Sequence, residues 1–390
     1  MEDMVRKEIP MKLDIEKLKK FYNGKRVLLT GHTGFKGCYL TAILSMLGAK
    51  VYGYSLIPPT EPSLFNIMFG GEAGNKSAKE LVSMARPDIR LEESCIGDIR
   101  DYEELKAFYN RSRPDVVFHL AAQPIVRDSY KFPRETYETN VMGTVNLLEC
   151  IRLNPCCISV LNVTTDKVYK NEEIEGYGYR EDDKLDGYDP YSNSKSCSEL
   201  VTHSYSSSFL KELGIPVSTA RAGNVIGGGD FANDRIIPDC VRAMLAKEKM
   251  LVRNPYSTRP YQHVMEPLFI YLTIAMMQAE DKSFAGWYNV GPDDCDCVTT
   301  GELTDLFRKY AGEDFGWYTT GRTEGPHEAN FLKLSNQKIK DVFGWKPIWH
   351  IDRAIEETVN WTKAWTESSD KANYEMARQI EKYMSEIKTM

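Results

Sequence analysis

The sequence predicts an α/β fold with a doubly wound parallel sheet, on the strength of three observations. From residue 24 onward, short runs rich in β-branched residues alternate with stretches of helical periodicity. These runs are apolar throughout, as in strands that crossover helices cover on both faces of a parallel sheet. A loop with three glycines follows the first run and opens the first helix.

The elements follow in order along the first half of the chain. The pattern predicts strands at 25–31, 50–56, 113–122 and 157–165. It predicts helices at 38–48 and 139–153. The segment from 58 to 92 contains Pro and Gly and then charged residues, so we expect a long connection with one helix near 77–85.

The second half is less regular, and glycine- and proline-containing stretches interrupt its elements. We expect the sheet domain over residues 20–221, with returns to it from about 260–295. A smaller, interleaved lobe is expected over 222–365, and a helical extension over 366–390. No internal repeat or low-complexity tract is present in the sequence.

Composition limits the classes of function. The 390 residues carry a formal net charge of -7 with a pI of about 5.6, which disfavours partners such as nucleic acid and anionic membranes. The first 26 residues contain no apolar stretch long enough for a signal peptide, so we expect a cytoplasmic protein. Nine cysteines at scattered spacings and only six histidines give no paired metal-binding array, so we predict reduced thiols and no metal site.

The glycine loop "LLTGHTGFKG" places Gly31, Gly34 and Gly37 between a strand and a helix. Glycines at this position allow a tight turn and let backbone N–H groups approach a pyrophosphate. The spacing is one residue wider at its start than the common dinucleotide fingerprint, and a plain strand-to-helix turn also tolerates glycines. Its place after the first strand of a βαβ pattern favours dinucleotide binding.

The ends of the next two strands bear on the choice of dinucleotide. An acidic residue at the end of the second strand binds the ribose of NAD, whereas Arg favours the phosphate of NADP. Ser55 stands there and gives neither answer; NAD is favoured because no Arg is near, and NADP is not excluded. Asp98 and Ile99 are candidates for the adenine edge and its apolar wall. The alternative for Asp98 is a helix N-cap.

Tyr191 and Lys195 lie four residues apart in "DPYSNSKSCSE", the spacing of one helix face. An ammonium beside the phenol favours the phenolate, which then serves as a base for a substrate hydroxyl. A tyrosine and a lysine at this spacing often occur together by chance, without a catalytic role. This pair gains weight from the glycine loop before it and from the polar strand end "VTTDKVY" at residues 163–169.

Six motifs in order, "GHTGFKG", "GDIRD", "HLAAQ", "TNVMGT", "TTDKVY" and "YSNSK", resemble the extended short-chain dehydrogenase/reductase family and its nucleotide-sugar 4,6-dehydratase branch. The resemblance runs from about residue 20 to about 365. It implies a Rossmann sheet and a reaction that removes hydride at C4 of a hexose, eliminates water across C5 and C6, and returns the hydride to C6. It also implies a homodimer formed through the helix of Tyr191, with a tetramer as the alternative assembly.

By this resemblance, cofactor-binding residues include the glycine loop and both Tyr191 and Lys195. The further cofactor-binding positions that it implies are Thr33, Phe35, Lys36, Leu120, Ala121, Ala122, Gln123 and Asn140.

The same resemblance assigns roles to the strand end. It implies that Thr165 orients the C4 oxygen, that Asp166 is the general acid at the C6 oxygen, and that Lys167 is the base at C5. Most members of the branch carry Glu where Lys167 stands, and the lysine resembles the members that act on CDP-linked hexoses. Since free lysine is charged below about pH 10.4, we hypothesise a bound state with Asp166 protonated and Lys167 neutral. The alternative is a solvated surface ion pair.

In the second lobe, "RAGNVIGGGD" suits a loop over a diphosphate and includes Arg221. The family usually has Trp where Tyr261 stands, which bears on the nucleobase end, and each basic residue could instead form an ordinary ion pair. The segment with His327 and Glu328 resembles the family's closing segment beneath the nucleotide pocket. The substrate-binding positions implied by the resemblance are Gln123, Arg127, Asn224, Arg235, Arg259, Tyr261 and His263.

Two alternatives stay open. A nucleotide-sugar 4-epimerase, or a dehydratase for a GDP- or dTDP-sugar, belongs to the same branch; an epimerase has no use for Asp166 and Lys167. A catalytically idle dinucleotide-binding regulator has no need of Tyr191 or Lys195.

Overall fold

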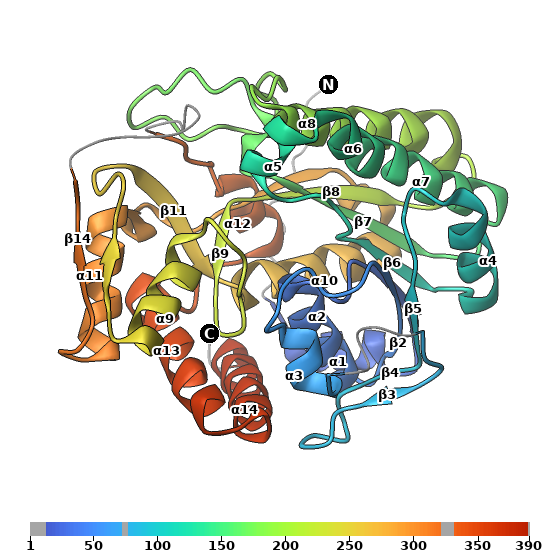
Figure 1. Cartoon of the computed structure of the whole chain (residues 1–390). Helices are drawn as coiled ribbons and strands as arrows, with labels where there is room; N and C mark the ends of the chain where they lie inside the picture. The colour runs from blue at the N-terminus through green and yellow to red at the C-terminus, as the bar shows by residue number, and fades with distance from the viewer. Residues whose placement is uncertain (1–12, 72–76, 321–330, 389–390) are drawn as a thin grey trace.

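The computed structural model describes residues 13–71, 77–320 and 331–388, so His327 and Glu328 lie outside the described residues. A seven-stranded sheet forms its centre, in the order β12-β8-β7-β6-β1-β2-β5, with every pairing parallel (Figure 1). The strands are β1 Arg26–Thr30, β2 Lys50–Ser55, β5 Glu93–Ile96, β6 Val116–His119, β7 Ser159–Thr165, β8 Val217–Ala222 and β12 Trp287–Val290.

This sheet confirms the predicted doubly wound fold. The strand order reverses beside β1, so that β1 lies between β2 and β6. In open parallel sheets of this kind, ligands bind at the carboxyl ends of the strands, at the point where the order reverses. The predicted cofactor loop at residues 31–37 follows β1 and therefore lies at that point.

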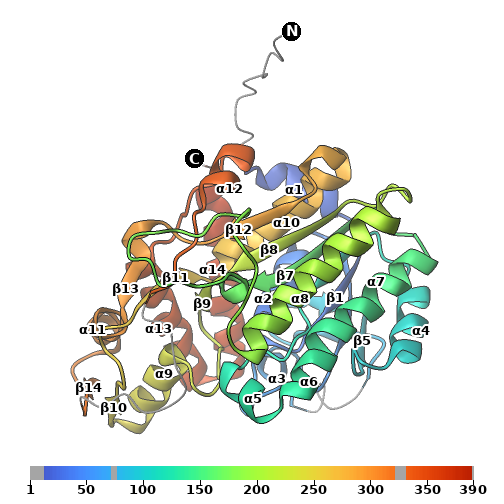
Figure 2. The same ribbon diagram turned by 90° about the horizontal axis from the view of Figure 1, so that it is seen from above.

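Helices cover both faces of the sheet (Figures 1 and 2). One face packs against α2 Phe35–Met46 and α10 Met265–Glu280, with α1 Ile15–Tyr22 and α12 Gln337–Phe343 beside them. The other face packs against helices α4 Tyr102–Ser112, α7 Gly143–Leu153 and α8 Pro190–Tyr205. Shorter helical segments join these: α5 Val126–Lys131, α6 Pro133–Tyr137, η2 Glu138–Met142, η3 Asp166–Val168, η4 Ser206–Leu210 and η5 Lys282–Phe284.

Helix α10 is apolar on every side because it is enclosed between the sheet and neighbouring helices. Together with β12 it brings the chain back to the main sheet after the second lobe has begun. No helix in the described ranges combines the length and apolarity needed to span a membrane.

The second lobe lies beside the carboxyl end of the sheet (Figure 2). Its three-stranded sheet has the order β13-β11-β9, and β10 pairs with β14. The strands are β9 Asn224–Ile226, β10 Lys249–Leu251, β11 Thr258–His263, β13 Cys297–Thr299 and β14 Gly316–Tyr318. The helices are α9 Ile236–Ala246, η6 Asp294–Asp296, α11 Thr300–Ala311 and α13 Ile351–Glu367. Helix α14 Ser369–Lys388 packs against α13 and joins the core of the sheet domain beside α1 and α3.

The long connection after β2 differs from the prediction at one place. It contains α3 Leu64–Phe69, but the helix predicted near 77–85 is wrong: β3 Leu81–Val82 pairs antiparallel with β4 Arg90–Leu91. Ala78 also exchanges backbone hydrogen bonds with Ser94, which belongs to the edge strand β5. Pairing with that distant segment satisfies the backbone here, and Pro87 leaves little room for a helix.

Candidate active site

The glycine loop forms a tight cradle at the carboxyl end of β1. Gly31 has a φ of +78°, and a Cβ there would come within 2.8 Å of the backbone N of Ala121. A Cβ on Gly37 would come within 2.2 Å of the Gly31 carbonyl oxygen. Helix α2 begins behind this loop, and its N-cap Gly34 supplies no side chain to the first N–H groups. The loop therefore fits a pyrophosphate, because the N–H groups at this helix start have no side-chain cap.

The polar side chains at the adenosine end of the predicted cofactor site form hydrogen bonds and ion pairs with neighbouring protein groups. The Ser55 hydroxyl lies 2.9 Å from the Thr33 hydroxyl, at the carboxyl end of β2. Asp98 pairs with Arg100 at 2.6 Å, and Asp101, not Asp98, caps α4 by accepting from the Glu104 N–H. The alternative of an N-cap at Asp98 is therefore wrong.

The segment after β6 is fixed by buried polar groups. The backbone N–H groups of Leu120 and Ala121 both donate to Thr30 Oγ1 at 3.2 Å. The Asn140 amide accepts from the Gln123 N–H at 2.8 Å and donates to Ser194 Oγ of α8 at 2.9 Å. Ala122 continues the segment.

Two other predicted positions on this side of the site have local partners. The Gln123 side chain bonds to the backbone of Ile125 in its own turn and donates from Nε2 to Thr136 Oγ1 of α6 at 3.0 Å. Ile99 lies buried and faces Gly143 at the start of α7.

The strand end at 165–167 holds a buried carboxylate with one free oxygen. Asp166 Oδ1 accepts from Thr165 Oγ1 at 2.9 Å and from Lys167 Nζ at 3.2 Å. Oδ2 is buried and has no hydrogen-bond partner among the described residues. A Cβ on Gly223 would come within 2.9 Å of that oxygen, so the glycine leaves it room. Because Asp166 is only 1 % exposed, the alternative of a solvated surface pair is wrong for the carboxylate.

Tyr191 and Lys195 are both buried in the first turns of α8, beside this strand end. Burial raises the pKa of the Tyr191 phenol, while the charge of Lys167 and a hydrogen bond with Thr165 lower it. Burial lowers the pKa of Lys195 to about 8. Its Nζ donates to the backbone oxygen of Val163 in β7, at 3.2 Å.

Cations from three parts of the chain converge here. Burial lowers the pKa of Lys36 in the glycine loop to about 7, with further lowering from Arg235, Lys195 and Lys167. Asp166 opposes this effect. The glycine loop, the strand end, α8 and the second lobe thus face one electropositive space, which suits ligands with diphosphate groups.

A buried ion pair that sequence reasoning missed joins these elements. Glu199 of α8 accepts from Arg221 at 2.9 Å, from Thr219 Oγ1 at 2.8 Å and from Thr164 Oγ1 at 2.5 Å. Arg221 was expected near a diphosphate loop; instead it lies in β8, is 1 % exposed, and also donates to Tyr169. Glu199 follows Lys195 by four residues, so the helical period was the one signal for it.

The predicted substrate residues of the second lobe occupy different environments. Arg235 pairs with Asp230 at 3.0 Å, and Arg127 of α5 lies 3.4 Å from Asp234. Asn224 of β9 pairs in register with Tyr261 of β11. The strands β9 and β11 of Asn224 and Tyr261 approach Asp166, since Pro260 of β11 and Asp166 both lie beside Gly223.

Two of the predicted substrate-binding residues, His263 and Tyr261, are buried. His263 is fully buried against the rings of Tyr39 and Trp349, and burial lowers its pKa to about 3. Tyr261 belongs to the core of the second lobe. The Arg259 guanidinium donates to the backbone oxygen of its neighbour Thr258 at 2.9 Å.

Fold and site together define a short-chain dehydrogenase/reductase-type protein: a Rossmann sheet, a glycine loop at its switch point, and a buried Tyr-x-x-x-Lys pair on the helix facing that loop. The chain belongs to the GDP-mannose 4,6 dehydratase family, whose sequence model matches residues 28–358.

Individual relatives narrow the comparison. The CDP-glucose 4,6-dehydratase of Salmonella typhimurium is 43% identical over 373 residues, which cover 94% of this chain and 98% of the relative. The dTDP-glucose 4,6-dehydratase of Bacillus anthracis, solved in complex with NAD, superposes with a TM-score of 0.67 at 22% identity, over 88% of this chain and 98% of its own. The Thermus thermophilus UDP-glucose 4-epimerase in complex with NAD superposes with a TM-score of 0.69 at 23% identity, over 87% of this chain and 99% of its own.

The cradle predicts the effect of a methyl group at Gly37. Alanine stabilises a helix interior by about 1 kcal/mol relative to glycine. Here the added Cβ meets backbone atoms at 2.2 and 2.7 Å, and overpacking of this kind costs roughly 1–3 kcal/mol. Because these contacts are with backbone atoms, which cannot rotate away, we expect the upper end of this cost, so that Gly37→Ala lowers the free energy of unfolding by about 2 kcal/mol net in urea titrations.

Gly286→Ala is the matched control, since nothing lies within 4 Å of a Cβ at that position. It should leave the free energy of unfolding within about 0.5 kcal/mol of the parent. Equal stabilities of the Gly37 variant and the parent would contradict the close approach of the loop to α2.

Proposed function

We propose that this protein is an NAD-dependent CDP-glucose 4,6-dehydratase, a lyase that converts CDP-D-glucose to CDP-4-keto-6-deoxy-D-glucose and water. The observation that carries the proposal is the buried Asp166 carboxylate, with its free oxygen, between Lys167 and Tyr191. The 43% identical relative supports the choice of the CDP-sugar, because it covers nearly the whole chain.

The chain's residues fit a dinucleotide at the glycine loop. Gly31 and Gly37 permit the close backbone approach, the start of α2 faces the diphosphate, and Lys36 adds a cation. Ser55 and Asp98 lie where the adenosine end is expected, and within the described ranges no arginine side chain that would select NADP is bonded to Ser55. A dinucleotide held by the glycine loop and Lys36 would supply the acceptor for the hydride of C4 and its donor to C6.

The residues of the strand end divide the proton transfers among them. Tyr191 takes the proton of the C4 hydroxyl, and Thr165 orients that oxygen through the hydrogen bond it shares with the phenol. Once C4 is a ketone, the hydrogen at C5 is acidic, and Lys167 Nζ removes it as a proton. Asp166 gives a proton through Oδ2 to the C6 hydroxyl, and that hydroxyl leaves as water. As the hydride returns to C6, the Lys167 ammonium gives a proton back to C5, so Lys167 acts at C5 in both directions while Tyr191 and Asp166 each handle one proton at an oxygen.

The cations hold the substrate without taking part in these transfers. Arg235 and Arg259 provide planar donors for a diphosphate, and Asn224 lies on the adjoining strand β9. An epimerase does not need the acid and base at 166 and 167, and a regulator does not need a buried tyrosine beside them. The dehydratase accounts for all three groups.

Lys195 acts in its charged form, as the partner of the Tyr191 phenolate. Burial lowers its pKa to about 8, and the charge of Glu199 raises it. Glu199 is itself fully buried and held by Arg221. Glu199 is therefore a positioning residue: it keeps Lys195 protonated up to a higher pH than burial alone would allow.

Substrate choice tests the function directly. The protein with NAD is incubated in turn with CDP-, dTDP-, GDP- and UDP-glucose, and with GDP-mannose. We expect the alkaline chromophore of a 4-keto-6-deoxysugar to develop with CDP-glucose and at least about tenfold more slowly with the others. A 4-epimer without the chromophore would instead indicate an epimerase.

The base at C5 is tested by exchange with deuterated water. Lys167→Ala should incorporate solvent deuterium at C5 of the product about 10²- to 10⁴-fold more slowly than the parent, because general-base catalysis is worth about that factor. Lys170→Ala is the control, an exposed lysine three residues further on that pairs with Glu172. Incorporation at the parental rate in the Lys167 variant would exclude this lysine as the base.

The role of Glu199 is tested by the pH profile of kcat. Activity needs protonated Lys195 and falls as the pH rises through its pKa; Glu199→Gln removes the charge that raises this pKa. The alkaline limb should therefore move to lower pH, by about 1 unit. Thr219→Val removes one hydrogen bond to the same carboxylate without changing its charge, and should leave the limb in place. An unmoved limb in the Glu199 variant would show a purely structural role.

A further inference from the structure

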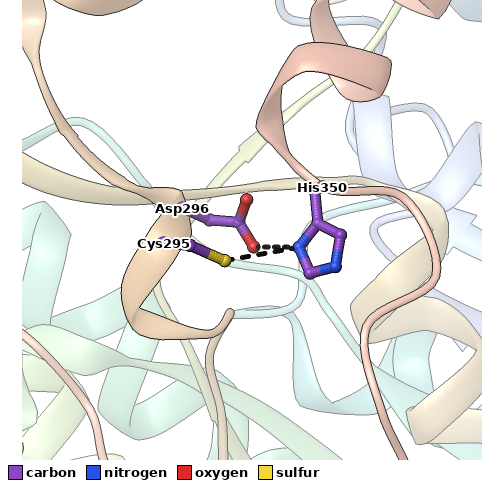
Figure 3. A group of neighbouring side chains, drawn as sticks. All are labelled: Cys295, Asp296 and His350. Carbon is purple, nitrogen blue, oxygen red and sulfur yellow. Dashed lines mark hydrogen bonds and ion pairs between the residues drawn. The ribbon is translucent and has the colours of Figure 1, made fainter.

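Three side chains with metal-binding donors meet at the edge of the second lobe, away from the strand end of the catalytic site. Cys295 and Asp296 lie in η6, and His350 is the N-cap of α13 (Figure 3). Their donor atoms all lie within 4.8 Å of one another. His350 Nδ1 faces both partners, 2.9 Å from Asp296 Oδ2 and 3.6 Å from Cys295 Sγ.

We propose that Cys295, Asp296 and His350 form a binding site for a divalent transition-metal ion of the zinc class. Thiolate, imidazole and carboxylate are the ligands that Zn²⁺ takes in proteins. In a tetrahedral site, bond lengths of about 2.3 Å to sulfur and 2.0 Å to nitrogen separate those two ligand atoms by about 3.6 Å. The Cys295–His350 separation already has that value.

The Asp296 carboxylate has a fixed orientation, as is typical of a metal ligand. Its carboxylate is buried, and Oδ1 accepts from the Ile351 N–H at 2.8 Å, which leaves Oδ2 directed at His350. Such a second hydrogen bond fixes the orientation of a ligand. Oδ2 has to move from His350 Nδ1 by only about half an ångström to reach the spacing of a tetrahedral site.

The charges also match. A thiolate at Cys295 and a carboxylate at Asp296 together balance a divalent ion, while neutral His350 adds none. The neighbouring acids are already paired: Asp293 with Lys340 and Asp294 with Lys333. The ion would therefore be neutralised by its own ligands, as a partly buried cation requires.

Solvent reaches the site from one side. Cys295 is exposed, the His350 side chain is 52% exposed, and Cys295 lines a pocket of about 600 Å³ together with Lys333 and Asn336. The fourth position is open to water. A bound ion would join η6 to α13, and α13 packs against β9 and β11 of the second lobe. We expect it to stabilise that lobe.

The sequence pattern predicted no metal site because His350 stands 55 residues from Cys295 and no paired array is present. Only the fold brings the three side chains together. The second lobe's path from β12 to α13 therefore creates a donor set that spacing rules do not detect.

Cobalt binding tests the proposal with the full-length protein, after dialysis against a chelator. Co²⁺ is added as the chloride, and the absorption bands of a thiolate-bound, tetrahedral ion are followed. We expect one Co²⁺ per chain with these bands, displaced by Zn²⁺. Cys295→Ser should abolish the thiolate band and weaken binding by at least about 100-fold, since changes to outer-shell partners alone cost about 10- to 100-fold.

Cys297→Ser is the matched control: it lies two residues further on, and its thiol faces the backbone oxygen of Asp293. It should keep the band and the affinity. Zn²⁺ should also raise the temperature of unfolding of the parent and of Cys297→Ser, but not of Cys295→Ser or His350→Ala. A parent without the thiolate band, a band that survives in Cys295→Ser, or one lost equally in Cys297→Ser would overturn the proposal.

Discussion

The buried pair of Glu199 and Arg221 is the interaction on which the arrangement of the site depends. An unpaired charge at either position would be strongly destabilising, so the two side chains must meet. Their meeting fixes α8 against β8, and the hydrogen bond from Thr164 fixes β7 to the same carboxylate. Tyr191 and the 165–167 strand end come from the two elements that this carboxylate joins, so their mutual position follows from it.

Burial then gives chemically similar groups different tasks. Asp166 is enclosed with one oxygen held by Thr165 and Lys167 and the other facing the space above Gly223. Lys36 and Lys195 both lose charge more readily than free lysine because burial lowers the pKa of each. Lys195 nevertheless stays charged beside Glu199 and favours the Tyr191 phenolate, whereas the sheltered Asp166 carboxyl has Oδ2 free to exchange a proton with the sugar.

Much of this fold could be predicted from the sequence, because apolar strands, helical periods and the glycine loop are local signals. The β3–β4 pairing could not, since residues 77–85 have helical composition and only the distant partner at 90–94 decides their conformation. Motifs identified the strand end and Tyr191, but not the burial of Asp166. From its motif, Arg221 was expected near a diphosphate. Its buried partner Glu199 could not be foreseen, because a strand sequence does not show which distant side chain meets it.

In the proposed reaction Lys167 and Asp166 reach the sugar from one strand end, the first at C5 and the second at the C6 oxygen. A crystal structure with NAD and CDP-glucose bound measures both positions. We expect Lys167 Nζ over C5 and Asp166 Oδ2 within hydrogen-bond distance of the 6-hydroxyl, about 2.5–3.0 Å. A Lys167 side chain that points into solvent, or a hexose that lies away from Asp166, would contradict it.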